Sequence, residues 1–376
     1  MNSIPPIDLT RQYFRFGPEM ETATADVLRS GRYIGGAAVD AFEQQFATYL
    51  GVSNCVACHS GTDALYLVMR ALNLGPGDEV ITTAFSFIAT SEAIALVGAK
   101  PVFVDIDCST FNLDAEQVAG AITERTKAIL PVHLFGQPAD MGTLGEIAAH
   151  NSLYVIEDCA QATGASWQNR KVGSFGQAGC FSFFPTKNLG GCGDGGAVTT
   201  NDADLAAAIR QLKNHGSSQR YRHEATGINS RLDGLQAAIL SVKLPYLDDW
   251  NRERQEIAAR YQTLLAPSQL KLPQATPGGI SVWNQYTVLF DTETAAARDR
   301  LQEKLQHSGI GTMVYYPIPL HRQPVYHNLG YQDGDLPQAE KAARQVLSLP
   351  MFPGLTPEEQ EQIACTLKDC LAAIAD

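Results

Sequence analysis

Basic residues are scarce in this chain. Its 376 residues include 28 Lys and Arg against 40 Asp and Glu, and the formal net charge is −12. Binding to nucleic acid without regard to sequence depends on neutralising many phosphates with Lys and Arg. The composition therefore argues against a nucleic-acid-binding protein, although a local basic cluster could still hold one small anionic ligand.

Long apolar runs and paired cysteine motifs are also missing. No run of about 18 apolar residues occurs, so no membrane-spanning helix is predicted. The first ten residues have no basic region followed by an apolar stretch, and we expect a cytoplasmic protein with reduced cysteines. Cys55 and Cys58 form a C-x-x-C motif without a second pair at zinc-site spacing. We expect both to be small apolar residues of a buried strand, and we expect no metal site.

Short apolar runs alternate with helical patterns between residues 40 and 215. Strands are predicted at 79–83, 101–105, 128–133 and 153–158, and helices at 62–72, 91–97 and 141–150. This alternation is typical of an α/β fold with a mostly parallel central sheet and helices on both faces. Functional residues of such folds lie at the ends of strands and in the loops that follow them.

The pattern changes in the C-terminal third of the chain. Residues 231–265 read as helical, with an interruption at Pro245. Strands are then predicted at 285–290 and 312–316, and helices at 292–307 and 357–375. We assign residues 1–250 to a large α/β domain and residues 251–376 to a smaller α+β domain.

One lysine, Lys187, lies between an aromatic run at 181–184 and a glycine-rich stretch at 190–196. A phosphate-binding P-loop is one interpretation, but its glycines must precede the lysine, and here they follow it. A dinucleotide-binding loop is a second one, but that loop must open a helix, and residues 197–200 resemble a strand. In the third interpretation the lysine itself does the chemistry. Apolar surroundings disfavour the ammonium form, and a neutral amine can form a Schiff base with an aldehyde such as pyridoxal phosphate.

That chemistry needs companions, and the sequence offers them at strand ends. Asp158 ends a predicted strand and could pair with a pyridinium nitrogen. The Ser-Gly-Thr sequence at 60–62 begins a predicted helix, whose free amides suit a phosphate. Phe85 and Phe87 follow another strand end and could cover a flat ring. Each feature alone is more often a helix cap, a turn residue or a core aromatic, and only the whole set together indicates this chemistry.

Motifs spread over almost the whole chain resemble those of the DegT/StrS family of nucleotide-sugar aminotransferases, which depend on pyridoxal phosphate. The motifs lie at 30–35, 60–65, 75–81, 157–161, 181–187, 193–197, 227–238 and 315–323, with a Leu-Ser-Leu-Pro run from Leu347. The resemblance implies a fold type I transferase with a large α/β domain and a smaller C-terminal α+β domain.

The same resemblance assigns roles to individual residues. Lys187 is expected to bond covalently to pyridoxal phosphate, with Asp158 at the pyridine nitrogen. The other residues expected to bind the cofactor are Gln161 near the ring hydroxyl, Phe87 on the ring face, and Gly61, Thr62 and Ser182 at the phosphate. Asn229 is expected to reach the phosphate of the neighbouring subunit, which implies a homodimer with shared active sites.

Substrate contacts are implied by the same route. The expected positions near the sugar nucleotide are Arg231, Tyr315, Tyr316 and His321, and candidate diphosphate ligands also include Arg32, Arg220 and Arg222. Some relatives have His-Tyr-Pro where this chain has Tyr315-Tyr316-Pro317, so the sugar contacts differ.

The expected reaction is transfer of an amino group from glutamate to the keto carbon of a nucleotide-linked sugar. The favoured acceptor is a UDP-linked 2-acetamido-3-keto uronate, and the alternatives are a dTDP-linked 3-keto-6-deoxyhexose and 4-keto sugars. Sugar dehydratases of the family lack the lysine that this chain keeps as Lys187. A regulatory protein that has kept the fold without the catalysis is an alternative of another class.

Overall fold

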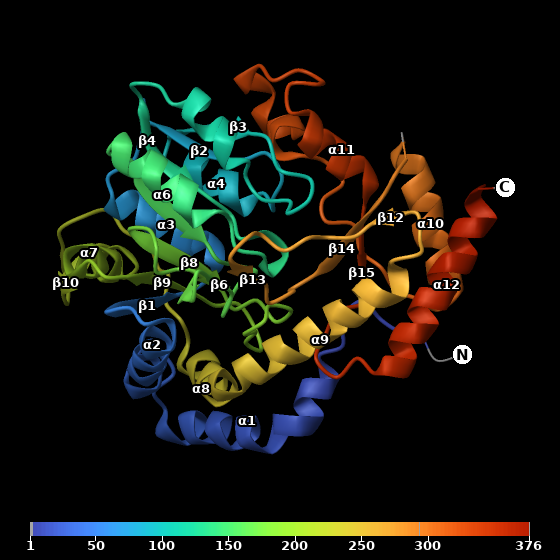
Figure 1. Cartoon of the computed structure of the whole chain (residues 1–376). Helices are drawn as coiled ribbons and strands as arrows, with labels where there is room; N and C mark the ends of the chain where they lie inside the picture. The colour runs from blue at the N-terminus through green and yellow to red at the C-terminus, as the bar shows by residue number, and fades with distance from the viewer. Residues whose placement is uncertain (1–2, 293, 376) are drawn as a thin grey trace.

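A seven-stranded sheet forms the centre of the larger part of the molecule (Figure 1), with strand order β1-β9-β8-β5-β4-β2-β3. The computed structural model describes residues 3–292 and 294–375. The strands are β1 (Asn54–Cys58), β2 (Glu79–Thr83), β3 (Lys100–Val104), β4 (Thr126–Leu130), β5 (Tyr154–Asp158), β8 (Ala178–Ser182) and β9 (Gly196–Thr200). Only β9 runs antiparallel to its neighbours in this sheet, so the predicted mostly parallel sheet is confirmed.

Helices cover both faces of the sheet, because successive strand residues point to opposite sides. Ala128 and Leu130 of β4 pack into a core with α3 (Gly61–Ala71), α4 (Ala89–Leu96) and α7 (Ala203–Leu212). Ile129 packs on the other side, with α5 (Ala115–Val118) and α6 (Met141–His150). Cys55 and Cys58 are both buried and enter opposite cores, which confirms that they are apolar strand residues.

The predicted boundaries in this part are close to the observed ones. The strand at 79–83 and the helix at 141–150 are reproduced at both ends. The strand expected to reach residue 133 ends at Leu130, because Pro131 has no N–H to donate to a ladder. Short 3-10 turns, η1 (Ala119–Ala121) and η2 (Leu134–Gly136), follow α5 and β4.

A second, antiparallel sheet forms the C-terminal part, with order β12-β14-β15. Its strands are β12 (Leu270–Lys271), β14 (Tyr286–Phe290) and β15 (Val346–Leu349). Helices α10 (Ala295–His307) and α12 (Pro357–Ala375) pack on it, as predicted for 292–307 and 357–375. The strand predicted at 312–316 was wrong: only Met313 makes a bridge, to Ser348, and Pro317 and Pro319 follow.

A long helix links the two sheets. The helical stretch predicted from 231 begins at Gly234 as α8 (Gly234–Lys243), turns through η3 (Leu244–Tyr246) at the proline, and continues as α9 (Leu247–Leu265). Figure 1 shows α9 running from α8 across to the C-terminal sheet, beside α12. The proposed domain boundary at residue 250 therefore falls inside a continuous helix.

Parts of the C-terminal third return to the large sheet. Strand β13 (Gly279–Ile280) pairs with β6 (Ser166–Trp167), which pairs with β7 (Arg170–Lys171). The turns η4 (Leu320–Arg322) and η5 (Pro324–Leu329) and helix α11 (Pro337–Gln345) pack against the ends of β2 and β3. The buried Asp105 carboxylate, just after β3, accepts the amides of Gln338 and Ala339 and so caps α11. Residues of the two proposed domains thus pack into one hydrophobic core near the ends of β2 and β3.

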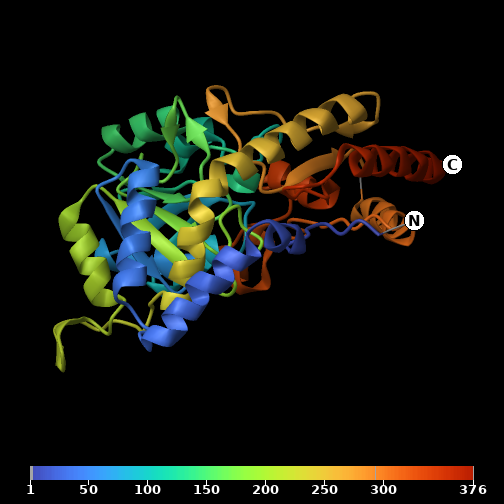
Figure 2. The ribbon, with the colours of Figure 1, turned by 90° about the horizontal axis from the view of Figure 1, so that it is seen from below.

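The remaining elements lie outside these layers. Helix α1 (Thr10–Ser30) packs on α8, and α2 (Ala37–Leu50) packs on α8 and β1. The short hairpin of β10 (Ser217–Gln219) and β11 (Arg222–His223) projects away from the body of the molecule (Figure 2). Of the described helices, none combines the length and the apolar character that crossing a membrane requires.

Candidate active site

Lys187 lies in the loop that follows β8, at the carboxyl end of the sheet. Its backbone amide donates to the carbonyl of Phe184 at 2.9 Å, so the chain turns tightly just before the lysine. The side chain is half-buried. Loss of hydration lowers the pKa of its amine to about 8, although the nearby Asp158 charge opposes that shift. A larger fraction of the amine is therefore neutral near pH 7 than in an ordinary lysine, which favours nucleophilic chemistry.

Asp158 ends β5, the strand next to β8, and its side chain is buried. Oδ2 accepts from the Thr90 hydroxyl at 2.8 Å, and Oδ1 accepts from the Ala160 amide at 3.1 Å. Burial raises the pKa of this carboxyl, and the two hydrogen bonds act in the opposite direction. Among the described residues, no Lys, Arg or His nitrogen lies within 4.0 Å of it. A buried carboxylate without a cation suits a ligand that brings a positive charge, as a pyridinium ring does.

The amino end of α3 provides the predicted phosphate site. Ser60 caps this helix by accepting the Asp63 amide at 3.1 Å, which leaves the first amides of the helix for another acceptor. Gly61 approaches Ser182 so closely that a Cβ at Gly61 would lie 2.8 Å from the Ser182 Cβ. The structure therefore brings together three residues that the sequence predicted for a phosphate, namely Gly61, Thr62 and Ser182.

An aromatic wall and an amide lie beside this site. Phe87 keeps 56% of its surface exposed, and its ring centroid lies 6.2 Å from that of Tyr316. The Gln161 Oε1 accepts from the Phe135 amide at 2.7 Å, and its Nε2 donates to the Tyr316 hydroxyl at 3.0 Å. These bonds fix the orientation of the Gln161 amide and leave one of its N–H groups for a ligand.

Asn229 and Arg231 lie on a separate loop that follows the projecting hairpin. Asn229 is exposed and makes a backbone bridge with Asn214. Between them, Ser230 is buried and donates to the Asp63 carboxylate at 2.6 Å, which ties this loop to α3. Arg231 donates from Nη1 to the Asn214 side chain at 3.4 Å, and its buried Nε has no partner among the described residues.

The other predicted substrate residues differ widely in exposure. Tyr315 and Tyr316 are half-buried, whereas Arg32, Arg220 and Arg222 are exposed. The His321 ring is buried, and its Nε2 lies 3.2 Å from a Glu340 carboxylate oxygen on α11. Burial lowers the pKa of His321, against the effect of that carboxylate. The ring is therefore enclosed by the protein in this chain.

Sequence reasoning missed a buried layer behind Asp158. The neighbouring Glu157 accepts the amides of Gly173, Phe175 and Gly176, and its Oε2 lies 3.1 Å from the His133 Nε2. Since His133 Nδ1 accepts the Ala139 amide, Nε2 carries the proton and donates to Glu157. With Cys159 these side chains form a cluster whose possible ligand atoms lie within 4.8 Å of one another. Its His and Glu atoms already have chain partners, so the cluster reads as support for the strand that carries Asp158.

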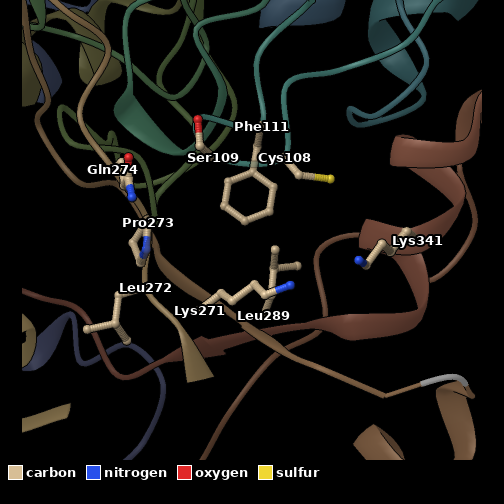
Figure 3. Close-up of a pocket in the computed structure, with 9 residues that line it drawn as sticks. All are labelled: Cys108, Ser109, Phe111, Lys271, Leu272, Pro273, Gln274, Leu289 and Lys341. Atoms are coloured by element: carbon tan, nitrogen blue, oxygen red, sulfur yellow. The ribbon is translucent and has the colours of Figure 1, made fainter. Parts of the chain in front are cut away.

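A separate cavity of about 360 Å³ lies between the loop at 108–111 and the strand β12. Figure 3 shows the ammonium ends of Lys271 and Lys341 directed into the space beneath the Phe111 ring, with Leu289 below. Lys271 also pairs with Asp291 at 3.4 Å. None of the residues that the sequence predicted for the site lines this cavity, so it is distinct from the Lys187 site.

Comparison with known proteins places this constellation in a family. The model of the DegT/DnrJ/EryC1/StrS aminotransferase family matches residues 16–368. A pleiotropic regulatory protein of Geobacillus stearothermophilus is 50% identical over 96% of both chains. The UDP-2-acetamido-2-deoxy-3-oxo-D-glucuronate aminotransferase of Pseudomonas aeruginosa is 46% identical over 93% of this chain and 95% of the relative. Further relatives at 45% identity are named for UDP-linked or dTDP-linked amino sugars.

Solved structures agree with this assignment. The S. venezuelae protein DesV, described in complex with a ketimine intermediate, superposes with a TM-score of 0.94 at 43% identity and 98% coverage of both chains. The predicted fold class is thereby confirmed, and so is the predicted dependence on pyridoxal phosphate. The chain is a sugar aminotransferase of the DegT/DnrJ/EryC1/StrS family and uses pyridoxal phosphate as its cofactor.

Proposed function

We propose that this aminotransferase moves an amino group from L-glutamate to C3 of a UDP-linked 2-acetamido-3-keto uronate. The catalytic part of the proposal rests on one observation: a half-buried lysine with a pKa of about 8 lies at the same sheet edge as a buried carboxylate that, among the described residues, has no cationic nitrogen within 4.0 Å. The choice of sugar rests on the Pseudomonas aeruginosa relative, which is named for such a substrate and is 46% identical.

Lys187 supplies the nucleophile and the proton carrier. Pyridoxal phosphate, when bound, offers an aldehyde carbon to amines and a ring that accepts an electron pair. The Lys187 amine would hold the cofactor through that aldehyde carbon and would be freed by the arriving amino donor. The free Nζ then accepts the proton that leaves the donor Cα, because its pKa of about 8 suits a general base near neutral pH.

Asp158 keeps the cofactor ring protonated in this proposal. Its carboxylate is fixed by Thr90 and by the Ala160 amide, so it is oriented before any ligand arrives. A protonated ring nitrogen that donated to this buried carboxylate would form a charge-assisted hydrogen bond with it. Phe87, with its exposed face, would cover the ring, and Gln161 would donate its free N–H to the ring hydroxyl.

The phosphate would be bound from two subunits. Gly61, Thr62 and Ser182 come from one chain, and Asn229 would come from the partner in a homodimer. Asn229 is exposed on a loop that Ser230 anchors to α3, so its side chain is free to reach another molecule. Arg231, two residues further on, has a buried Nε without a partner in the described part of the chain and would bind an anionic group.

The sugar nucleotide would contact residues around this shared site. Proposed direct contacts are Arg231, Tyr315 and Tyr316, with Arg32, Arg220 and Arg222 as candidate diphosphate ligands. The Tyr316 hydroxyl accepts from Gln161, so its own proton remains available for a substrate oxygen. His321, being buried, would have to act through Tyr331 or Glu340, which contact its ring, rather than by direct contact.

The test is a coupled assay. Purified protein is incubated with pyridoxal phosphate, L-glutamate and a panel of UDP-linked and dTDP-linked 3-keto and 4-keto sugars. Release of 2-oxoglutarate and product mass are measured together. Amination of the UDP-linked 3-keto uronate supports the proposed substrate, whereas amination of a dTDP-linked or a 4-keto sugar would replace it.

A regulatory role without catalysis is the other candidate, because a relative at 50% identity is named as a pleiotropic regulatory protein. A regulator that binds the cofactor without transferring an amino group would show no 2-oxoglutarate with any sugar. Retention of both Lys187 and Asp158 favours the catalytic role, since a binding protein needs no nucleophilic amine.

A further inference from the structure

Three buried asparagines surround the loop that carries Lys187. Asn188, Asn251 and Asn284 are exposed by 2%, 4% and 3%, respectively. They come from three distant parts of the chain: the Lys187 loop, helix α9 and the segment before β14. Buried amides are costly unless they are hydrogen-bonded, so their contacts define what holds them together.

The amides form one continuous chain of hydrogen bonds. Asn188 donates from Nδ2 to the Asn251 Oδ1 at 2.7 Å and to the Val282 carbonyl at 2.9 Å. Asn284 donates to the Asn188 Oδ1 at 2.9 Å, and Asn251 donates to the Thr163 carbonyl at 3.1 Å. Each donor faces an oxygen, so the orientation of every amide in the chain is determined by its neighbours.

This hydrogen-bond network contacts the backbone on both sides of Lys187. Asn188 follows the lysine directly, and the Thr186 carbonyl, just before it, accepts from the Asn284 Nδ2 at 3.3 Å. At the far end, Thr163 lies two residues after Gln161 in the loop that follows Asp158. The network therefore links the lysine's loop to the loop of the cofactor residues, with α9 between them.

We propose that Asn188, Asn251 and Asn284 are positioning residues that fix the Lys187 amine relative to Asp158. The inference rests on the proposed catalytic role of Lys187. A lysine on an unsupported loop would sample many positions, whereas proton transfer needs donor and acceptor atoms held within hydrogen-bonding reach. A displacement of about 1 Å from a distant change can cost about 100-fold in rate.

Asn251 is the residue to change, because it lies on α9 and belongs to none of the predicted cofactor or substrate contacts. In Asn251→Ala, the Asn188 Nδ2 loses one acceptor and the Thr163 carbonyl loses its donor. We expect kcat to fall by about 100-fold, with KM for glutamate changed by less than about threefold. The matched control is Gln360→Ala, which also removes a buried amide donor, to the Ile257 carbonyl, from the C-terminal core.

The second readout is the pKa of Lys187 in cofactor-free protein, measured by competitive acetylation across pH with peptide mass analysis. Asn188→Asp replaces a donor by a carboxylate beside the lysine, and we expect it to raise the Lys187 midpoint by about one unit. Asn251→Ala should also move the midpoint, because the amine relaxes toward solvent. Gln360→Ala should lower the melting temperature but leave the Lys187 midpoint unchanged.

The two proposals fail in different ways. If borohydride reduction of the wild-type holoenzyme attaches no cofactor to Lys187, the proposed catalytic role is lost. If the wild type is labelled but Asn251→Ala matches Gln360→Ala in both kcat and Lys187 midpoint, the asparagines serve stability only and the positioning proposal is overturned. Changes in kcat and midpoint confined to the asparagine variants support it.

Discussion

A lysine amine loses its proton more readily when the protein removes water from around it, and the Lys187 loop does so. Its pKa of about 8 leaves about a tenth of the amine neutral at pH 7, against less than about one part in a thousand for an ordinary lysine. We expect the rate at which cofactor-free protein bonds to pyridoxal phosphate to rise with pH and to level off above about 8. Stopped-flow absorbance measures this rate. A rate that still rose at pH 10 would mean that the pKa of Lys187 is not lowered.

The charge of Asp158 is expected to affect both the pKa of Lys187 and the rate of the reaction. Its charge raises the pKa of Lys187, so in Asp158→Asn we expect the lysine midpoint to fall below its present value of about 8. The lost charge should also reduce kcat by about 100- to 1,000-fold, since a preorganised charge acts on the developing transition state. Competitive acetylation and steady-state kinetics test the two effects separately. A variant with wild-type kcat would remove Asp158 from the mechanism.

At the scale of elements, the contact between α3 and β8 determines where a phosphate can bind. In Gly61→Ala, the new Cβ would lie 2.8 Å from the Ser182 Cβ, so the helix start must move away from the strand end. Overpacking of this kind costs about 1–3 kcal/mol, and we expect affinity for pyridoxal phosphate to fall about tenfold or more. Equilibrium dialysis measures it.

Gly145→Ala is the matched control for that change. Gly145 lies inside α6, and a Cβ there would meet no atom within 4 Å. Alanine is the better helix former, so this variant should keep its cofactor affinity and gain stability. Equal loss of affinity in both variants would show that the approach of α3 to β8 is not specific to the cofactor.

Helices and strands were predicted well where the apolar pattern agrees with capping and turn residues. Long-range hydrogen bonds that support the site were not predicted. The helix at 141–150 has a capping Asp140 that accepts two amides and a regular apolar face, and both ends were found. The strand predicted at 312–316 does not form, because the segment makes only one bridge, at Met313, and prolines follow at 317 and 319. Strand propensity alone does not predict where a segment leaves a sheet. The roles of Thr90, Glu157 and the three asparagines depend on partners 16 to 98 residues away, and no local pattern signals such contacts.

At the scale of the whole molecule, a shared active site predicts complementation. Lys187→Ala and Asn229→Ala should each be inactive or nearly so as homodimers. If the two variants are mixed, unfolded and refolded, half of the dimers should be heterodimers. Each heterodimer has one site that contains both Lys187 and Asn229, so about a quarter of all sites should be active. Activity is measured after removal of free cofactor.

The complementation result distinguishes between two arrangements. If Asn229 served the site of its own chain, no heterodimer would contain an intact site and mixing would restore nothing. Its exposure in the single chain, on a loop anchored through Ser230 to α3, favours the arrangement in trans. Analytical ultracentrifugation of the separate variants controls for loss of the dimer itself.

The central claim is that the Lys187 amine, poised by its surroundings and by Asp158, carries the amino transfer. The most direct measurement is a single half-reaction: protein loaded with pyridoxal phosphate is mixed with excess L-glutamate, without sugar, and 2-oxoglutarate is counted per chain. The account predicts about one 2-oxoglutarate per wild-type chain and none on the same timescale from Lys187→Ala. Equal release from both proteins would contradict it.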